Sequence, residues 1–306
     1  MLLELRDGRL WMLVRDRGGR LWQSFSTDGG ARWPALERSP FISSDSPATL
    51  LRLGDGRILL LTNACQNWSD PRSYAMGGRE VLHAAISADE GRTWRGFREV
   101  LHEPPVATRG DRGTAYASAV ENAAGKIVVV SGQGEGKRAL LAFDPRWLEE
   151  TDTRDDLATG PVQWTAYGKA AVRAGSARVI AIPIEAGEAV GAQWNFPVGA
   201  SGEISLRIEV PAGVSSLKLC LNDHFTRLDD RKAAAHAVFV APITEAGTLA
   251  VSLRWNTREL VVRVGGTERR VAAQRPAQFG VNYLRIEFEA AERGDVTVSD
   301  LVARGR

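Results

Sequence analysis

Cysteine is scarce in this sequence. The 306 residues include two cysteines, Cys65 and Cys220. They fall in segments that we predict to belong to different domains, so we expect no framework of disulfide bonds, and neither has the spacing of a metal ligand. We expect both thiols to fill small spaces in the hydrophobic core. No metal or other cofactor is predicted.

Long apolar runs and a strong net charge are also missing. No stretch reaches the roughly 18 apolar residues of a membrane span. Residues 1–8 lack the apolar segment of a signal peptide and lead directly into strand-like sequence. The formal net charge is +2, with lysine and arginine spread along the whole chain. These features predict a soluble globular protein of two domains, with neither a nucleic acid nor a membrane as its partner.

Two segments share one template. Residues 26–33 read Ser-Thr-Asp-Gly-Gly-Ala-Arg-Trp, residues 87–94 read Ser-Ala-Asp-Glu-Gly-Arg-Thr-Trp, and both fit Ser-x-Asp-x-Gly-x-x-Trp. In a tight turn between strands, the carboxylate accepts backbone N–H groups, glycine allows a positive φ, and tryptophan packs beneath the turn. The alternative is two unrelated hairpin turns of similar composition. We assign structural roles in the turns to Asp28, Trp33, Asp89 and Trp94.

The first 150 residues repeat a unit of strand, turn and strand. The copies span residues 2–14, 49–62 and 117–131, with glycine-containing turns between aliphatic flanks. Units of this kind that recur about every 50 to 70 residues are typical of β-propeller blades. Residues 1–150 are therefore predicted to form two to three blades. Asp144 and Pro145 predict a capped short helix after them, and residues 151–161 a polar linker.

The remainder of the chain, residues 162–306, has a different pattern. Short alternating runs separated by glycine, proline, asparagine and aspartate predict an antiparallel β-sandwich of the jelly-roll or lectin-like kind. The predicted strands span residues 203–210, 216–221, 235–240, 249–255, 259–264, 268–273, 282–289 and 295–301. The expected fold class is all-β, with a partial propeller followed by this sandwich.

The two Ser-x-Asp-x-Gly-x-x-Trp segments resemble the Asp-box, or BNR repeat, of sialidases and related β-propellers. Residues 1 to about 150 are similar to the later blades of a sialidase. In that family, three arginines bind the substrate carboxylate, a tyrosine paired with a glutamate attacks the anomeric carbon, and an early-blade aspartate is the acid and base. The resemblance implies an exo-acting, retaining glycoside hydrolase whose partner is a sialoglycan or another acidic glycan.

The resemblance also assigns site residues by their place beside the Asp-boxes. Arg15 ends a strand before the first box, as the second family arginine does. Arg79 precedes the strand into the next box, as the third arginine does, with Arg72 as a nearby competitor. Tyr116, before the last hairpin, has the setting of the nucleophile. Arginine's planar fork suits a carboxylate, and sialidases use a tyrosine nucleophile. Surface ion pairing for the arginines and packing for the tyrosine are the structural alternatives.

Other parts of the family pattern are missing from this sequence. We find neither the Phe/Tyr-Arg-Ile-Pro motif of the first arginine nor the early-blade aspartate. The glutamate partner of Tyr116 would fall just before Met1, and Glu4 lies one step too late. We therefore expect an N-terminally truncated, sialidase-like protein that has little or no activity alone, its open edges covered by another chain or by the sandwich. The parent protein is expected to be secreted or periplasmic, and the localisation of this chain stays open.

Two other functions remain open. One alternative is a non-catalytic glycan-binding protein. The other is part of another Asp-box propeller glycosidase or lyase, with a different pocket. Polar residues that would line such a pocket, or are ordinary loop residues, are Asn63, Gln66, Asn67, Asp111 and Gln133. The sandwich is either a carbohydrate-binding module or a packing domain. Its polar run with Asn222, Asp223, His224, Asp229 and Asp230 is either a sugar or calcium site or a solvated loop.

Overall fold

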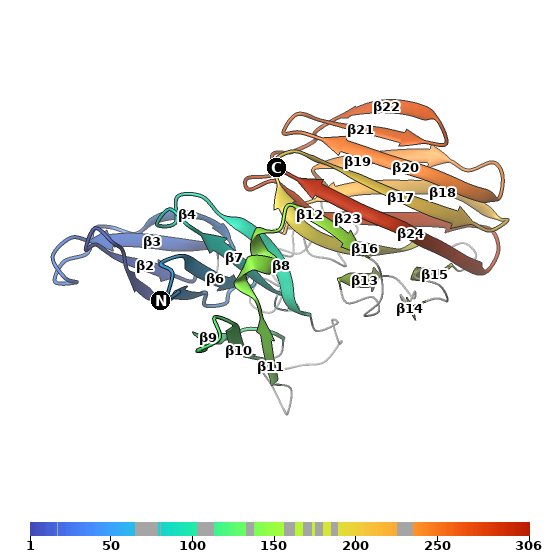
Figure 1. Cartoon of the computed structure of the whole chain (residues 1–306). Coiled ribbons are helices and arrows are strands. Elements are labelled where there is room, and N and C mark those ends of the chain that lie inside the picture. The colour runs from blue at the N-terminus through green and yellow to red at the C-terminus, as the bar shows by residue number, and fades with distance from the viewer. Residues whose placement is uncertain are drawn as a thin grey trace. The chain divides into compact units, whose positions relative to one another are not determined.

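The computed structural model describes residues 1–16, 18–64, 79, 81–102, 113–132, 138–155, 163–167, 173–174, 180–184, 189–224 and 235–306. The chain divides into two compact units, Met1–Glu150 with His224–Ala233, and Thr151–Asp223 with Ala234–Arg306. The structured elements are β-strands and one 3-10 turn within the described ranges (Figure 1), so the all-β prediction is confirmed. In this part of the chain, no helix is long and apolar enough to cross a membrane.

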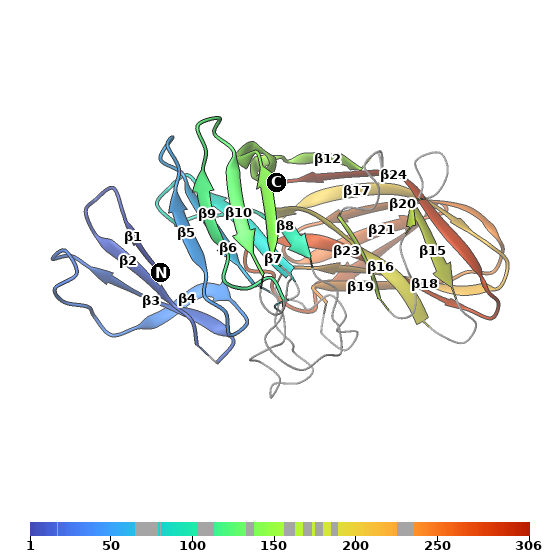
Figure 2. The same ribbon diagram turned by 90° about the horizontal axis from the view of Figure 1, so that it is seen from below.

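The first unit contains propeller-like sheets whose strands follow one another in sequence. The sheet order is β1-β2-β3-β4, then β5-β6-β7-β8, then β9-β10-β11, and all pairs are antiparallel. Strand β5 lies beside both β1 and β9, so the first strands of the sheets are neighbours (Figure 2). The strands are β1 (Leu2–Glu4), β2 (Leu10–Val14), β3 (Arg20–Ser26), β4 (Glu37–Ile42), β5 (Thr49–Arg52), β6 (Ile58–Thr62), β7 (Val81–Ser87), β8 (Arg95–His102), β9 (Ser118–Glu121), β10 (Ile127–Ser131) and β11 (Ala139–Phe143).

The middle sheet contributes its two central strands to the core of the first unit. Strands β6 and β7 are buried along their whole length, as expected for central strands covered on both faces. Their aliphatic side chains form one cluster with those of β10 and the turn after β11, namely Leu59, Leu61, Leu82, Ala84, Ile86, Ile127, Val129 and Leu148. The near-continuous apolar sequences of these strands therefore reflect packing between neighbouring blades.

Both Asp-boxes form the same hydrogen-bonded turn. In the first, Asp28 Oδ1 accepts hydrogen bonds from the Ser26 hydroxyl, at 2.8 Å, and from the Arg32 backbone N–H, at 2.9 Å. Trp33 Nε1 donates to the Gly30 carbonyl at 3.0 Å. The second box repeats these contacts with Asp89, Ser87, Thr93, Trp94 and Gly91. The turn is thus held by contacts within eight residues, which is why a short motif encodes it.

The second Asp-box also joins the first two sheets. Trp94 is buried and packs against Trp11 of β2 and Phe41 of β4, with ring centroids 6.4 and 5.5 Å apart. A Cβ on Gly91 would lie 3.0 Å from the Trp11 ring, so only glycine fits this contact without displacement. The tryptophan therefore packs into a neighbouring blade as well as beneath its own turn.

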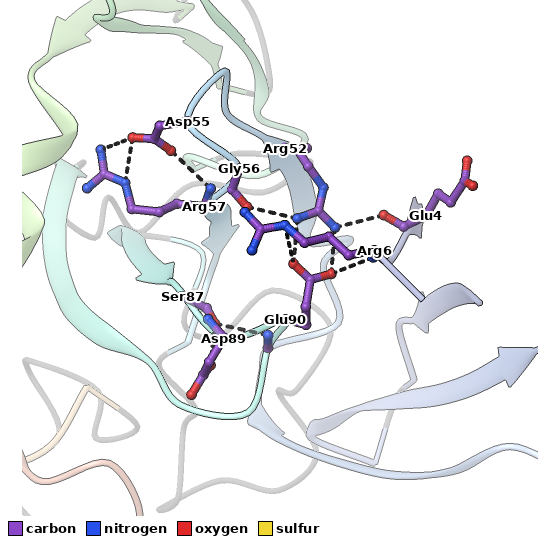
Figure 3. Close-up of polar contacts among 10 residues, drawn as sticks. Glu4, Arg6, Arg52, Asp55, Gly56, Arg57, Ser87, Asp89 and Glu90 are labelled. Atoms are coloured by element: carbon purple, nitrogen blue, oxygen red, sulfur yellow. Dashed lines mark hydrogen bonds and ion pairs between the residues drawn. The ribbon is translucent and has the colours of Figure 1, made fainter. Parts of the chain in front are cut away.

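An ion-pair network lies on the same turn (Figure 3). Glu90 accepts two hydrogen bonds from Arg52, at 2.7 and 2.8 Å, and one from the backbone N–H of Arg6 at 2.9 Å. Arg52 also donates to the backbone carbonyl of Glu4. The hydrogen bonds from Arg52, above all, lower the pKa of Glu90 to about 2. This carboxylate connects three segments of the first unit through one side chain.

A 3-10 turn, η2 (Pro145–Glu149), follows β11. Asp144 caps it through a hydrogen bond from the Arg146 backbone N–H, and proline occupies the first turn, as the sequence predicts. The guanidinium of Arg98 on β8 lies 3.9 Å from the Trp147 ring centroid and donates to Glu150. Burial lowers the pKa of Arg98 to about 10. The side chain of Arg98 therefore connects this turn to strand β8 of the middle sheet.

The second unit is a sandwich of two antiparallel sheets. One has the order β14-β15-β24-β17-β20-β21-β22, with β12 also paired to β24, and the other has the order β13-β16-β23-β18-β19. The strands are β12 (Asp152–Asp155), β13 (Trp164–Tyr167), β14 (Arg173–Ala174), β15 (Ile180–Ile184), β16 (Ala189–Gly199), β17 (Gly202–Val210), β18 (Val214–Asn222), β19 (Ala237–Pro242), β20 (Gly247–Trp255), β21 (Glu259–Val264), β22 (Thr267–Ala272), β23 (Val281–Ala290) and β24 (Gly294–Gly305).

The core of the sandwich lies between its two sheets. Alternate residues of β17, such as Ile204, Leu206 and Ile208, are buried while their neighbours are exposed. Trp194, Phe196 and other inward side chains of the opposite sheet complete the cluster. The period-2 pattern in the sequence thus predicted β17 and the strands after it, whereas β13 to β16 were not among the predicted strands.

The start of the second unit differs from the sequence prediction. Residues 152–155 were predicted as linker, but they form β12, which pairs with β24 through Asp152↔Arg304 and Thr153↔Ala303. The polar composition of these residues gave no strand signal. Strand β12 has a single pairing partner among the described strands, so it needs little apolar surface. Residues 156–161 of the predicted linker lie outside the described residues, as does Cys65. Cys220 is buried on β18, and burial raises the pKa of its thiol.

Candidate functional site

The three residues assigned from the resemblance lie together in the first unit. Arg15 follows β2, Arg79 precedes β7, and Tyr116 precedes β9. Arg15 Nη1 donates a hydrogen bond to the Tyr116 hydroxyl at 2.9 Å. The guanidinium carbons of Arg15 and Arg79 lie 5.7 and 5.9 Å from the centroid of the Tyr116 ring. Two cations therefore flank one phenol, although these residues are separated by up to 101 positions in the sequence.

The three side chains differ in exposure. Arg15 has 43% of its side chain exposed, and Tyr116 is 49% exposed, whereas Arg79 is only 5% exposed. The hydrogen bond to Tyr116, together with attraction to Asp45, raises the pKa of Arg15 above its usual range despite partial burial. The cluster thus presents a reachable phenol and a permanently charged guanidinium to solvent, with a second arginine beneath them.

Asp45 belongs to the same cluster and was missed by the sequence analysis. Its carboxylate oxygen lies 3.9 Å from Arg15 Nε, and its backbone carbonyl accepts a hydrogen bond from Arg79 Nη2. It lies between β4 and β5 in a run of small polar residues, Ser43-Ser44-Asp45-Ser46. Such a run has the composition of an ordinary loop, so no periodicity or motif singled it out.

The backbone of Tyr116 is in an unusual conformation. Its φ is +60°, in the left-handed region that bulky residues seldom adopt. Three contacts hold the chain on either side: Thr49 Oγ1 donates to the carbonyl of Ala117, the Gly132 N–H donates to that of Ala115, and Ser131 Oγ donates to that of Thr114. A strained residue persists where its surroundings determine its conformation, and such residues cluster at functional sites.

Thr114 connects the backbone of Arg79 to the segment that carries Tyr116. Its N–H and its hydroxyl both donate to the Arg79 carbonyl, at 2.6 and 3.0 Å. The Asn63 amide donates to the Thr114 hydroxyl at 2.9 Å and to the Val81 carbonyl at 2.8 Å. Asn63 was a candidate pocket residue, but it is buried and its amide makes these internal contacts. The other candidates, Gln66, Asn67, Asp111 and Gln133, and the competitor Arg72, lie outside the described residues.

The Asp-boxes lie away from this cluster along the strands. Arg15 follows Val14 at the end of β2, and Val14 pairs with Trp22. The first box begins at Ser26, which pairs with Leu10 at the other end of β2. Arg79 likewise precedes the start of β7, and the second box begins at its end, Ser87. Candidate site residues and boxes therefore occupy opposite ends of the same strands.

One residue of the predicted polar run, Asp223, has a clear structural role. Asp223 is buried and accepts two hydrogen bonds from Arg275, at 2.6 and 2.9 Å. Its carboxylate thus already has a cationic partner, while Asp229 and Asp230 lie outside the described residues. Within the described ranges, no group of three or more His, Cys, Asp and Glu side chains is placed to hold a metal ion.

Two further features of the sandwich were not found from the sequence. Glu287 on β23 is buried, and its carboxylate lies 3.3 Å from Lys218 Nζ. Burial and the neighbouring Glu289 nevertheless raise the pKa of its carboxyl to about 7.

A groove of about 680 Å³ opens at the edges of β19 and β22. It is lined mainly by aliphatic side chains, together with Phe239 and Arg269. The alternation of these strands indicated their buried faces but not the space between their edges.

Comparison with known proteins supports the family resemblance. Residues 1–129 match the family model of the BNR repeat-like domain, so the resemblance drawn from the two Asp-boxes is confirmed for this part of the chain. Among curated protein sequences, none matches the chain.

The solved structures that match this chain include sialidases. A sialidase shares 14% identity at a TM-score of 0.43, covering 99% of this chain and 32% of that one. Trypanosoma rangeli sialidase shares 15% identity at a TM-score of 0.34, covering 100% of this chain and 59% of that one. The same enzyme has been solved with 2,3-difluorosialic acid as a covalent intermediate, with 15% identity and a TM-score of 0.34. The present chain spans 32% to 59% of the length of these proteins.

Proposed function

We propose that this chain carries the carboxylate-binding and nucleophile-bearing part of a sialidase-like glycoside hydrolase, and that alone it binds sialosides without turning them over efficiently. The observation that carries the proposal is the cluster of Arg15, Arg79 and Tyr116. Its cations flank an exposed phenol whose backbone is held in the left-handed region.

The chemistry of an acidic sugar fits these side chains. A guanidinium keeps its charge at any physiological pH and pairs two N–H groups with a carboxylate. A phenol suits an anomeric carbon that already bears a carboxylate, because the neutral nucleophile adds no second full charge beside the first. Sialidases are the tyrosine-nucleophile exception among retaining glycosidases. In this assignment Arg15 and Arg79 bind the carboxylate and Tyr116 Oη attacks the anomeric carbon.

Efficient turnover needs two further proton transfers. A general acid must protonate the leaving glycosidic oxygen, and a base must accept the phenol proton. The family assigns these steps to an aspartate and a glutamate that we could not match to residues of this sequence. A positioned acid or base typically contributes on the order of a hundred- to ten-thousand-fold. We therefore expect hydrolysis by the isolated chain to fall below a complete sialidase by at least such a factor.

Calorimetric titration with N-acetylneuraminate tests the binding part of this proposal. We expect measurable affinity that Arg15→Gln weakens at least tenfold, because a bidentate ionic contact is lost. Arg9→Gln is the matched control, since Arg9 pairs with Asp7 in an exposed turn. If wild type and Arg15→Gln bind equally, or neither binds, the carboxylate assignment is wrong.

Release of a fluorescent phenol from a synthetic sialoside tests the catalytic part. We expect release at or near the background rate for the isolated chain. Substantial release that is lost in Tyr116→Phe would contradict the expected inactivity and establish Tyr116 as the nucleophile. Binding that depends on Arg15 but not on Tyr116 would instead favour the second candidate, a non-catalytic glycan-binding protein.

A further inference from the structure

Residue 45 touches both arginines of the candidate site, and it does so with two different groups. Its carboxylate lies 3.9 Å from Arg15 Nε, while its backbone carbonyl accepts a hydrogen bond from Arg79 Nη2. The Asp45 side chain is 15% exposed, so this carboxylate is largely removed from solvent. From this geometry we propose that Asp45 is a positioning residue, which orients Arg15 for binding the carboxylate of an acidic sugar. The inference rests on the proposed function of the cluster.

The shape of the guanidinium explains how one carboxylate orients it. Arginine has five N–H donors in a fixed plane, one on Nε and two on each terminal nitrogen. Asp45 faces the Nε edge, and Tyr116 accepts a hydrogen bond from Nη1 at 2.9 Å. The hydrogen bond to Tyr116 and the ionic attraction of Asp45 therefore act on two different edges of the guanidinium. The terminal nitrogens then face the phenol and the solvent, since 43% of the Arg15 side chain is exposed.

Charge gives a second reason for an acidic side chain at this position. Arg15 and Arg79 both lie within 6 Å of one ring, and like charges at such short range repel each other. The Asp45 carboxylate offsets part of that repulsion while leaving the cluster a net positive charge. A ligand carboxylate therefore still meets an attractive site. An ordinary exposed ion pair would contribute little, but here the Asp45 side chain is only 15% exposed, although 43% of the Arg15 side chain is exposed.

The variant Asp45→Asn separates these effects. It removes the charge, keeps the size of the side chain, and leaves the backbone carbonyl that accepts the hydrogen bond from Arg79. Asp45→Glu is the conservative variant for rescue. The matched control is Asp55→Asn, because Asp55 also pairs with an arginine, Arg57, on a turn of the same unit.

The first readout needs no ligand. In a crystal structure of the full chain with Asp45→Asn, we expect Arg15 to turn away and its hydrogen bond to Tyr116 to be lost, while Arg79 keeps its position. Asp55→Asn should leave both arginines in place. Arg15 still bonded to Tyr116 in the Asp45→Asn structure would overturn the inference, whatever the ligand affinity.

The second readout is the affinity for N-acetylneuraminate, compared with its uncharged methyl ester. We expect Asp45→Asn to raise the Kd for the acid about tenfold and to leave that for the ester within twofold, with partial recovery in Asp45→Glu. Unchanged or tighter binding of the acid would mean that Asp45 merely competes with the ligand, and the inference would be wrong. If wild type binds neither compound, the proposed function fails, and the ligand-free structure still decides the role of Asp45.

Discussion

Trp33 and Trp94 occupy the same position in the two Asp-boxes, yet their surroundings differ. Both indole nitrogens donate to a glycine carbonyl in the turn. Trp94 is 6% exposed and contacts Trp11 and Phe41, whereas Trp33 is only half-buried. The motif therefore specifies the turn at the residue scale, and the neighbouring blade determines what each tryptophan contributes to stability.

The first prediction compares these two positions. Trp94→Ala removes a buried aromatic side chain between two sheets and should lower the free energy of unfolding by about 3 to 5 kcal/mol. Trp33→Ala removes mainly its own turn contacts and should lower it by roughly 1 to 2 kcal/mol. Urea unfolding followed by circular dichroism measures both. Equal losses would mean that Trp94 does not join the sheets.

A second residue-scale prediction concerns Glu90 and pH. Its pKa is about 2 in the folded protein, compared with 4.5 for an ordinary glutamate. The ionised carboxylate therefore stabilises the folded state above pH 4.5, and this contribution is lost as the pH falls from 4.5 towards 2. We expect Glu90→Gln to lower the free energy of unfolding by about 1 to 2 kcal/mol at pH 7, and by much less near pH 2.5.

Denaturant unfolding of wild type and Glu90→Gln at both pH values checks this expectation. Glu4→Gln is the control, because Glu4 contributes its backbone carbonyl to Arg52 and its substitution keeps that contact. A difference between wild type and Glu90→Gln that persists unchanged at pH 2.5 would contradict the assigned pKa.

At the scale of elements, the segment before β9 determines where the phenol lies. Gly113 has φ +93°, and a Cβ there would lie 2.3 Å from the carbonyl oxygen of Arg79. The neighbouring Thr114 makes two hydrogen bonds to that same carbonyl. The two chain segments are therefore in contact through backbone atoms, which do not give way as a flexible side chain would.

The third prediction tests this backbone contact. Gly113→Ala should separate the two segments, lower the free energy of unfolding by more than about 2 kcal/mol, and weaken N-acetylneuraminate binding. Gly125→Ala, in the hairpin between β9 and β10, has φ +71° but nothing closer than 3.9 Å to the added Cβ. It should lower stability by only about 1 kcal/mol and leave binding unchanged. Equal effects on binding would show that the contact does not position the site.

Much of this element-level structure could be predicted from the sequence. The hairpin of β5 and β6, with Gly54-Asp55-Gly56 as its turn, was correctly predicted. Turn residues and alternating strands are local signals in the sequence. Strands β12 to β16 were not predicted. The pairing of β12 with β24 joins Thr153 to Ala303 and leaves no mark on nearby composition. The cluster of Arg15, Arg79 and Tyr116 was proposed by family resemblance, and the role of each residue stays a prediction.

At the scale of the whole molecule, two compact units share one chain. Each has its own apolar cluster, one around Leu59 and Leu82 and the other around Trp194 and Leu219. Separate cores are the physical basis for separate unfolding. We therefore expect differential scanning calorimetry of the full chain to resolve two transitions.

Single substitutions assign these transitions and form the fourth prediction. Trp94→Ala should lower the midpoint of one transition by several degrees and leave the other unchanged, and Trp194→Ala should do the reverse. The size of each shift follows from losing a buried aromatic side chain in one core. A single transition that both substitutions move together would show that the units unfold cooperatively.

The sequence by itself determined the all-β class, the two Asp-box turns and the sandwich strands from β17 to β24. Their contacts are short in range: each box is completed within eight residues, as between Ser26 and Trp33. Tertiary structure alone decided that Asp45 meets Arg15 and Arg79, which lie 30 and 34 positions away in the chain. Contacts at that separation depend on how blades pack against one another, and local propensity carries no information about such packing.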